Sequence, residues 1–141
     1  MISLHRAHAL AEAGLRWRPV SGDSFAIPGK DMDAARFTVS ELTIEVHTYP
    51  TGTVLGFNGT TEWALDSVAV EDTLWLPRED QLRELLGETF VALTRDGTAY
   101  QVHTHDAVDG EARAYTAAAP ADAYADALLH LLREAGAAST P

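Results

Sequence analysis

The chain contains no cysteine among its 141 residues. This absence excludes disulfide bonds, thiolate zinc sites, iron–sulfur clusters and cysteine nucleophiles. Basic side chains are also scarce, because Lys30 and nine arginines oppose 21 aspartates and glutamates, which gives a formal net charge of −11. Such a surface repels phosphate backbones and anionic membranes. The composition therefore predicts that the protein binds neither nucleic acid nor membrane.

Long apolar runs are missing as well, and none reaches the length of a membrane span. Near the N-terminus, His5, Arg6, His8 and Glu12 interrupt the apolar residues, so the segment lacks the central apolar region of a secretion signal. Both observations predict a cytoplasmic protein.

Several motifs of catalysis and cofactor binding are absent too. The chain has no Walker A motif, no G-x-G-x-x-G dinucleotide fingerprint, no G-x-S-x-G nucleophile elbow and no Ser-x-x-Lys pair. We therefore predict no cofactor and favour a protein that is not an enzyme.

The overall composition, with 46% hydrophobic and 22% charged residues, is typical of a globular protein. A chain of this length suits one core. The sequence predicts a single α+β domain over residues 1–136, followed by a flexible C-terminal tail over residues 137–141.

Three helices are predicted from spacing and capping signals. The first covers residues 4–13, with Ser3 as N-cap and Gly14 as the stop. The second follows Pro77 as its first residue and ends at Gly87. The third opens at Pro120, buries apolar residues as far as Ala135 and stops at Gly136.

Five to six short strands are predicted between these helices, and short turns favour antiparallel pairing. Residues 24–27 suit an edge strand, residues 42–49 and 54–57 form a hairpin, and residues 111–118 suit a further strand. Another hairpin, over residues 88–105, turns at Asp96-Gly97. Together the elements predict an α+β fold in which an N-terminal, a central and a C-terminal helix pack on an antiparallel sheet.

The second hairpin carries the sharpest candidate for chemistry, because His103 and His105 alternate on one face of a strand and could bind one divalent metal. Glu45, His47 or Glu62 would supply a third ligand. The alternative needs no metal. With a turn at Asp96-Gly97, the carboxylate of Glu88 pairs with His105 and the ring of Phe90 covers His103.

The stretch GFNGTTEWALDS, residues 56–67, admits two interpretations. As a structural corner, Asn58-Gly59 ends a strand and a short helix begins at Glu62, with Trp63 and Val68 packed on the core. As a binding site, Asn58, Glu62, Trp63 and Trp75 line a groove for a partner or ligand. The local turn and cap chemistry favours the corner.

Residues 27–33, 57–68 and 75–86 read IPGKDMD, FNGTTEWALDSV and WLPREDQLRELL. In these strings the chain resembles a group of small, acidic actinobacterial proteins that often carry the label "pilus assembly protein CpaE". The resemblance implies an accessory role in pilus or secretion assembly. It implies no ATPase activity, because the P-loop of the pilus ATPase is missing here.

Taken together, these observations favour a non-catalytic intracellular domain that binds a protein or small ligand and forms a homodimer, through an acidic face or an exposed part of its sheet. The alternative is a metal-dependent or general acid–base hydrolase that uses the His-x-His strand pair.

Overall fold

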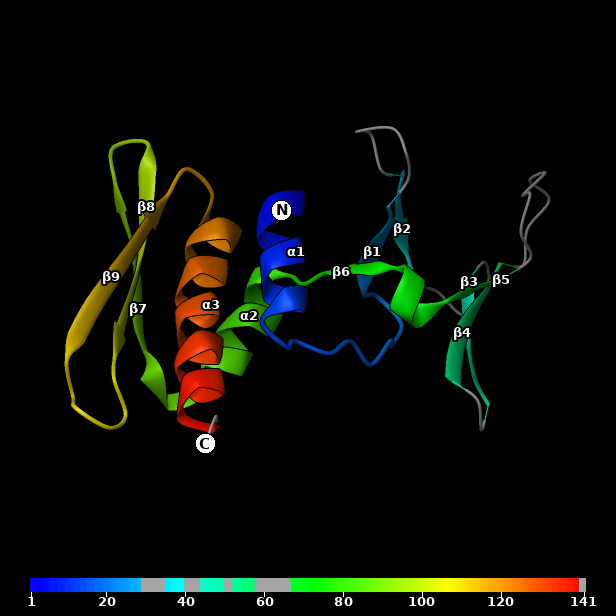
Figure 1. Cartoon of the computed structure of the whole chain (residues 1–141). Coiled ribbons are helices and arrows are strands. Elements are labelled where there is room, and N and C mark those ends of the chain that lie inside the picture. The colour runs from blue at the N-terminus through cyan, green and yellow to red at the C-terminus, as the bar shows by residue number, and fades with distance from the viewer. Residues whose placement is uncertain (29–34, 40–43, 50–51, 58–66, 140–141) are drawn as a thin grey trace. The chain divides into compact units, whose positions relative to one another are not determined.

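The computed structural model describes residues 1–28, 35–39, 44–49, 52–57 and 67–139. Within these ranges the chain forms three α-helices and three antiparallel sheets of three strands each (Figure 1). The predicted α+β class, with N-terminal, central and C-terminal helices, is confirmed. The chain divides into two compact units, Met1–Leu15 with Pro77–Pro141, and Arg16–Leu76. That residues 1–136 fold as a single domain stays a prediction.

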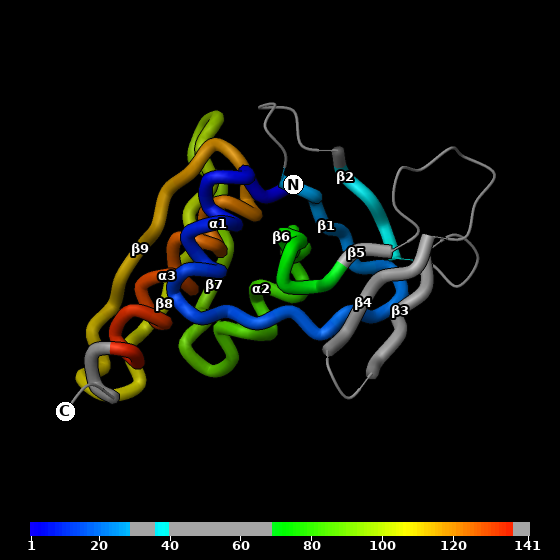
Figure 2. Tube along the Cα trace, turned by 45° about the vertical axis from the view of Figure 1, so that its right-hand side comes forward, coloured from blue at the N-terminus to red at the C-terminus, as the bar shows by residue number. Residues whose placement is uncertain are grey.

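The first unit holds all three helices, α1 (Leu4–Glu12), α2 (Glu79–Leu86) and α3 (Pro120–Ser139). Its sheet has the order β7-β8-β9, formed by β7 (Phe90–Asp96), β8 (Ala99–His105) and β9 (Ala112–Ala117). Helix α3 lies against β8 and β9 on one side and contacts α1 and α2 on the other (Figures 1 and 2). No helix in the described part of the chain is long and apolar enough to cross a membrane.

Local signals place the ends of α1 and α2. The Ser3 hydroxyl accepts a hydrogen bond from the Arg6 N–H at 3.3 Å and caps α1, as predicted. Gly87 ends α2 with a φ of 58°, in the left-handed region that favours glycine. The start of α2 differs from the prediction, because Arg78 rather than Pro77 flanks its first turn. The Arg78 N–H donates to the Gln81 side chain at 2.9 Å.

Helix α3 runs past its predicted stop. It continues to Ser139, so Gly136 lies inside the helix. That residues 137–141 form a flexible tail stays a prediction. An internal glycine costs a helix only about 1 kcal/mol relative to alanine. The alanines at 135, 137 and 138 are the strongest helix formers and offset that cost. Ala135 itself is exposed rather than buried.

The core of the first unit lies where α3 meets the other helices and the sheet. Its fully buried members are Ile2, Ala7, Leu10, Leu82, Leu86, Val102, Ala121, Ala123, Tyr124, Ala125, Ala127 and Leu128. Four of them are alanines of α3, whose small side chains let neighbouring elements approach its axis closely. The ring of Tyr124 fills the remaining space and lies 5.6 Å from the ring of Phe90, centroid to centroid.

An ion-pair clamp joins α1 to α3. The Arg6 guanidinium donates to both carboxylate oxygens of Asp126, at 2.9 and 3.3 Å, and lies 3.5 Å from Asp122. Asp122 also accepts the Ser3 N–H at 2.8 Å. The hydrogen bonds that Arg6 donates to Asp126 raise the pKa of Arg6 above its ordinary value. Two-point pairing of this kind fixes orientation as well as contact, so the clamp sets how α1 lies on α3.

The β7–β8 hairpin forms where predicted, but with a different register. Its turn is Gly97-Thr98, Leu93 lies opposite Val102, and Ala92 lies opposite His103. Gly97 has a φ of 63°, while no other residue type has a positive φ among the described residues. A turn with glycine at its first central position is type II′, whereas the predicted type I′ turn needs positive φ at both central positions. A bulge between Phe90 and Ala92 then shifts the pairing so that Phe90 lies opposite Thr104.

The second unit contains two sheets. Strands β1 (Ser24–Ile27), β2 (Ala35–Thr38) and β6 (Leu74–Leu76) pair in the order β2-β1-β6, while β3 (Ile44–Tyr49), β4 (Gly52–Phe57) and β5 (Ser67–Ala69) pair in the order β3-β4-β5. The predicted hairpin of β3 and β4 is confirmed. The prediction of an edge position for β1 is wrong, because β1 is the middle strand. Phe25 and Ala26 are both fully buried, so neither face of β1 meets solvent.

Aromatic rings stabilise the sheet around β1. The ring of Phe25 lies 5.3 Å from Trp17 and 5.4 Å from Phe37, centroid to centroid. These distances fall in the range where aromatic pairs contribute about 0.5–1.5 kcal/mol beyond burial. The Trp17 indole N–H also donates to the buried Asp23 carboxylate at 2.9 Å. Trp17 therefore has a structural role.

The predicted helix from Glu62 falls mainly on residues 58–66, which lie outside the described residues. Its expected last packing residue, Val68, is described and belongs to β5, opposite Leu55 of β4. That part of the prediction is wrong. Valine is β-branched and fits a pleated strand better than a helix.

Candidate functional site

The sheet of the first unit has one face that turns away from α3. Val102 is completely buried and Thr104 is nearly so, because both side chains point toward α3. Side chains alternate along a strand, so Gln101, His103 and His105 point the other way. His103 and His105 thus share one face, as the sequence predicted.

We call this surface the outer face. The register extends it from β8 across both neighbouring strands. Its residues are Val91, Ala92 and Thr94 from the β7 side, Gln101, His103 and His105 from β8, and Ala112, Ala114 and Thr116 from β9. Helix α3 lies on the opposite side of the sheet (Figure 1).

An open hollow of about 410 Å³ lies on the outer face. Its lining residues are Val91, Ala92, Thr94, His103, Thr104, His105, Ala112 and Arg113. Ligand pockets usually measure roughly 300–1,000 Å³ and combine apolar walls with a few polar groups. The hollow has a volume in this range, and it combines valine and alanine side chains with two histidines, two threonines and an arginine.

Both imidazoles of the outer face make a hydrogen bond through Nε2. His103 Nε2 lies 2.8 Å from the Thr94 hydroxyl. His105 Nε2 lies 2.8 Å from the backbone carbonyl of Glu88, which only accepts, so this nitrogen carries a proton. The predicted pairing of His105 with the Glu88 carboxylate is replaced by this contact with the carbonyl. Phe90 does not cover His103, because the bulge turns its ring toward Tyr124.

The other predicted metal ligands belong to a different part of the sequence. Glu45 and His47 belong to β3 of the second unit, opposite Gly56 and Val54 of β4, and Glu62 lies outside the described residues. Among the described residues, no group of three or more histidine, aspartate or glutamate side chains is arranged to hold a metal ion. The outer face therefore brings together two imidazoles of the predicted set.

The predicted partner-binding residues are placed only in part. Asn58, Glu62 and Trp63 lie outside the described residues. Trp75 lies on β6 opposite Phe25 of β1 and is half-buried. Its buried indole N–H has no hydrogen-bond acceptor within the described part of the chain.

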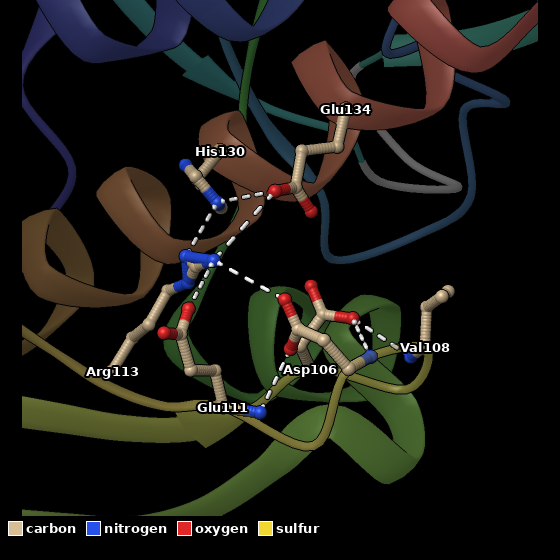
Figure 3. Close-up of polar contacts among 7 residues, drawn as sticks. Asp106, Val108, Glu111, Arg113, His130 and Glu134 are labelled. Atoms are coloured by element: carbon tan, nitrogen blue, oxygen red, sulfur yellow. Dashed lines mark hydrogen bonds and ion pairs between the residues drawn. The ribbon is translucent and has the colours of Figure 1, made fainter.

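A second polar cluster joins the β8–β9 connection to α3 (Figure 3). Arg113 Nη2 lies 3.1 Å from Glu111, and Arg113 Nη1 lies 3.3 Å from His130 Nε2. The same His130 nitrogen lies 2.9 Å from Glu134 Oε1. None of these residues was among the candidates predicted from the sequence. The one available signal was the i, i+4 spacing of His130 and Glu134 on a helix.

Hydrogen-bond chemistry limits what this cluster can do. A guanidinium only donates and a carboxylate only accepts. The Nε2 of His130 can therefore accept from Arg113 when it is unprotonated, or donate to Glu134 when it is protonated, but it cannot do both. The half-open space beside the cluster is about 20 Å³, enough for about one water molecule. This space is too small for a substrate, so we assign the cluster a structural role. We call it the latch, because the contact of Arg113 with His130 joins β9 to α3.

The β8–β9 connection is held by Asp106. Its carboxylate accepts the backbone N–H groups of Val108, at 2.7 Å, and Asp109, at 3.1 Å. These bonds lower the pKa of Asp106, with smaller contributions from the side chains of Glu134 and Arg113. The Asp106 backbone closes the loop further, since its N–H donates to the Glu111 carbonyl and its carbonyl accepts from Gly110.

This lowered pKa predicts a pH dependence of stability. Ionised Asp106 stabilises the folded chain above the ordinary aspartate pKa of about 3.9, and the contribution is lost as the pH falls below that value. We expect Asp106→Asn to lower the thermal midpoint at pH 6 and to approach the wild-type midpoint near pH 2.5. Thermal unfolding followed by circular dichroism measures both. Asp96→Asn, at the end of the same sheet, is the matched control. A gap that stays constant over this pH range contradicts the assignment.

No protein-family model, no curated protein sequence and no solved structure matches the chain.

Proposed function

We propose that the chain is a non-catalytic binding domain whose binding surface is the outer face of the β7-β8-β9 sheet. The observation that carries this proposal is the charge of that face. None of the nine residues that define it is an aspartate, glutamate, lysine or arginine. Two charged residues border the face: Asp96 lies at the hairpin end of β7, and Arg113 also lines the hollow, but its guanidinium contacts Glu111 and His130. The whole chain, in contrast, contains 31 charged residues, the sum of 10 basic and 21 acidic ones.

A sheet face whose own residues are uncharged suits binding for a physical reason. The centres of protein interfaces are depleted of charged residues, because desolvating a charge is costly. Val91 adds exposed apolar surface, with 59% of its area accessible. The hollow beside it gives a partner's side chain a place to enter. Together these features supply the apolar contact and shape that binding needs.

Catalysis has weaker support at the same place. The Thr94 hydroxyl and His103 Nε2, 2.8 Å apart, resemble a nucleophile and its base. Such a pair also needs a third group to orient the base and N–H donors for the developing oxyanion. Among the described residues, Thr94 is the side chain bonded to the His103 ring, and the backbone of β8 is engaged in pairing with β7 and β9. We therefore favour binding over hydrolysis.

Pilus or secretion assembly is the setting we propose for this domain. The support for it is the resemblance of residues 57–68 and 75–86 to the small actinobacterial proteins described above. No argument about the outer face depends on this setting.

The proposal is tested by native mass spectrometry of protein purified without a metal-affinity column, with the denatured mass as reference. We expect a bound species, either a ligand or another chain, on the wild type. Ala114→Glu, which places a charge on the outer face, should remove that species. Ala135→Glu places the same charge on an exposed alanine of α3 and should retain it. A wild-type chain with nothing bound, or binding that survives Ala114→Glu, contradicts the proposal.

A further inference from the structure

We infer that the latch is a pH-sensitive switch, in which protonation of His130 exchanges a contact between β9 and α3 for a contact within α3. The inference rests on the position of one atom, His130 Nε2, and is independent of the function proposed for the outer face. This nitrogen lies 3.3 Å from Arg113 Nη1 on β9 and 2.9 Å from Glu134 Oε1 on α3 (Figure 3). The two contacts need opposite states of the nitrogen, because a guanidinium only donates and a carboxylate only accepts.

Without a proton, Nε2 of His130 joins the strand to the helix. The nitrogen then accepts a hydrogen bond from the Arg113 guanidinium, and the ring carries its proton on Nδ1. Glu134 is left to pair with the same guanidinium, since Arg113 Nη2 lies 4.0 Å from its carboxylate. In this state Arg113 of β9 holds two side chains of α3.

Protonation of His130 reverses the exchange. The imidazolium has no acceptor nitrogen, so its Nε2 donates to Glu134, four residues further along the same helix. It also repels the guanidinium of Arg113, a second cation 3.3 Å away. Arg113 keeps its contact with Glu111 at 3.1 Å, in the β8–β9 connection. The direct contact between β9 and α3 is therefore lost, while each charged group still has a partner of opposite charge.

The exchange needs only side-chain rotation. His130 is 40% exposed and Glu134 is 44% exposed, so protons from solvent reach both. The space beside them is half-open and takes about one water molecule. Partly exposed side chains change rotamer on a picosecond to nanosecond timescale. The two arrangements can therefore interconvert while the core of the first unit stays packed.

Most other groups around His130 keep one charge over the range in which histidine ordinarily titrates, about pH 5–8. Backbone N–H groups lower the pKa of Asp106, so it stays a carboxylate, and burial raises the pKa of Tyr115, so it stays a neutral phenol. Helix α2 contributes the uncharged Leu86, whereas His105 of β8 can itself titrate in this range. The charged and titratable groups near His130, from β8, the β8–β9 connection, β9 and α3, are His105, Asp106, Asp109, Glu111, Arg113, Tyr115, Asp126 and Glu134.

The tautomer of His130 is the first test. Long-range ¹H–¹⁵N spectra of the labelled chain distinguish the Nδ1–H tautomer, the Nε2–H tautomer and the imidazolium of each histidine. We expect His130 to be the Nδ1–H tautomer at pH 8 and the imidazolium at pH 5. His105, whose Nε2 donates to the Glu88 carbonyl, should be the Nε2–H tautomer at pH 8 and is the reference in the same spectrum. An Nε2–H tautomer of His130 at pH 8 overturns the inference, because this nitrogen would then donate to Glu134 in both states.

Hydrogen exchange of the β9 amides, expressed as protection factors at each pH, tests the consequence. We expect protection to fall about three- to tenfold from pH 8 to pH 5, the size of one lost hydrogen bond. His130→Gln, a neutral side chain whose carbonyl accepts from Arg113 at any pH, should keep the higher protection at both pH values. His130→Lys, which is cationic throughout, should show the lower protection at both. Circular dichroism verifies that each variant folds.

His105→Gln is the matched control for this experiment, because it removes the other histidine beside the same space. It should retain the pH difference of the wild type. Equal protection of wild-type β9 at pH 5 and pH 8 overturns the inference. A difference that persists in His130→Gln, or that His105→Gln abolishes, assigns the pH response to another group and overturns it as well.

Discussion

Replacing Tyr124 with alanine should lower the free energy of unfolding by about 3–5 kcal/mol, the usual cost of deleting a large buried aromatic ring. The ring is 1% exposed at the centre of the first unit and lies 5.6 Å from the ring of Phe90. Its sequence neighbours Ala123 and Ala125 are too short to fill the space that the ring leaves. We therefore expect the cavity to persist and the cost to fall near the upper end of the range.

Urea denaturation followed by circular dichroism at helix wavelengths measures this cost, because all three described helices belong to the first unit. The matched control is Leu85→Ala on α2, where 42% of the leucine is exposed. We expect the control to cost less than about 1 kcal/mol. Similar losses for Tyr124→Ala and Leu85→Ala would contradict the assignment of Tyr124 to the core.

The second large effect is expected at Asp23, the buried carboxylate of the second unit. Its Oδ2 accepts the Trp17 indole N–H at 2.9 Å and the Val20 backbone N–H at 3.2 Å, while its backbone carbonyl accepts from Val39 at 2.8 Å. Asp23→Ala removes the side-chain acceptor and leaves two donors without it. A buried donor without a partner costs about 1–3 kcal/mol, so we expect a total loss of about 3 kcal/mol.

Tryptophan fluorescence during urea denaturation measures this loss, because Trp17, Trp63 and Trp75 all lie in the range Arg16–Leu76. Asp23→Asn is the informative companion, since the amide oxygen still accepts a hydrogen bond and should recover part of the stability. If Asp23→Ala unfolds at the wild-type urea concentration, the carboxylate does not hold Trp17 in place.

Comparison of sequence and structure shows which features local chemistry determines. The cap at Ser3, the glycine at the end of α2 and the hairpin between residues 90 and 105 all follow from neighbours in the chain. The exact hairpin pairing does not, because it depends on which residue beside Gly97 takes a positive φ. A shift of the turn by one residue changes every partner across the strands, and so the expected contacts of His103 and His105.

Features that depend on distant parts of the chain were harder to predict. The middle position of β1 follows from pairing with β6, about fifty residues later. The latch of Arg113 with His130 requires knowing that α3 lies along β9. The outer face is likewise defined by the helix on the opposite side of the sheet. The sequence located both histidines on one face, but only the packing of α3 shows that this helix covers the opposite face of the sheet.

The clamp between Arg6 and Asp126 joins positions separated by 120 residues. During synthesis α1 leaves the ribosome first, and its buried residues Ala7 and Leu10 have no helix to pack on until α3 has been made. The second unit, which is continuous in sequence, is complete well before then. The apolar side of α1 therefore lacks its partner helix while the residues between α1 and α3 are being added, and exposed apolar surface of this kind is prone to aggregation.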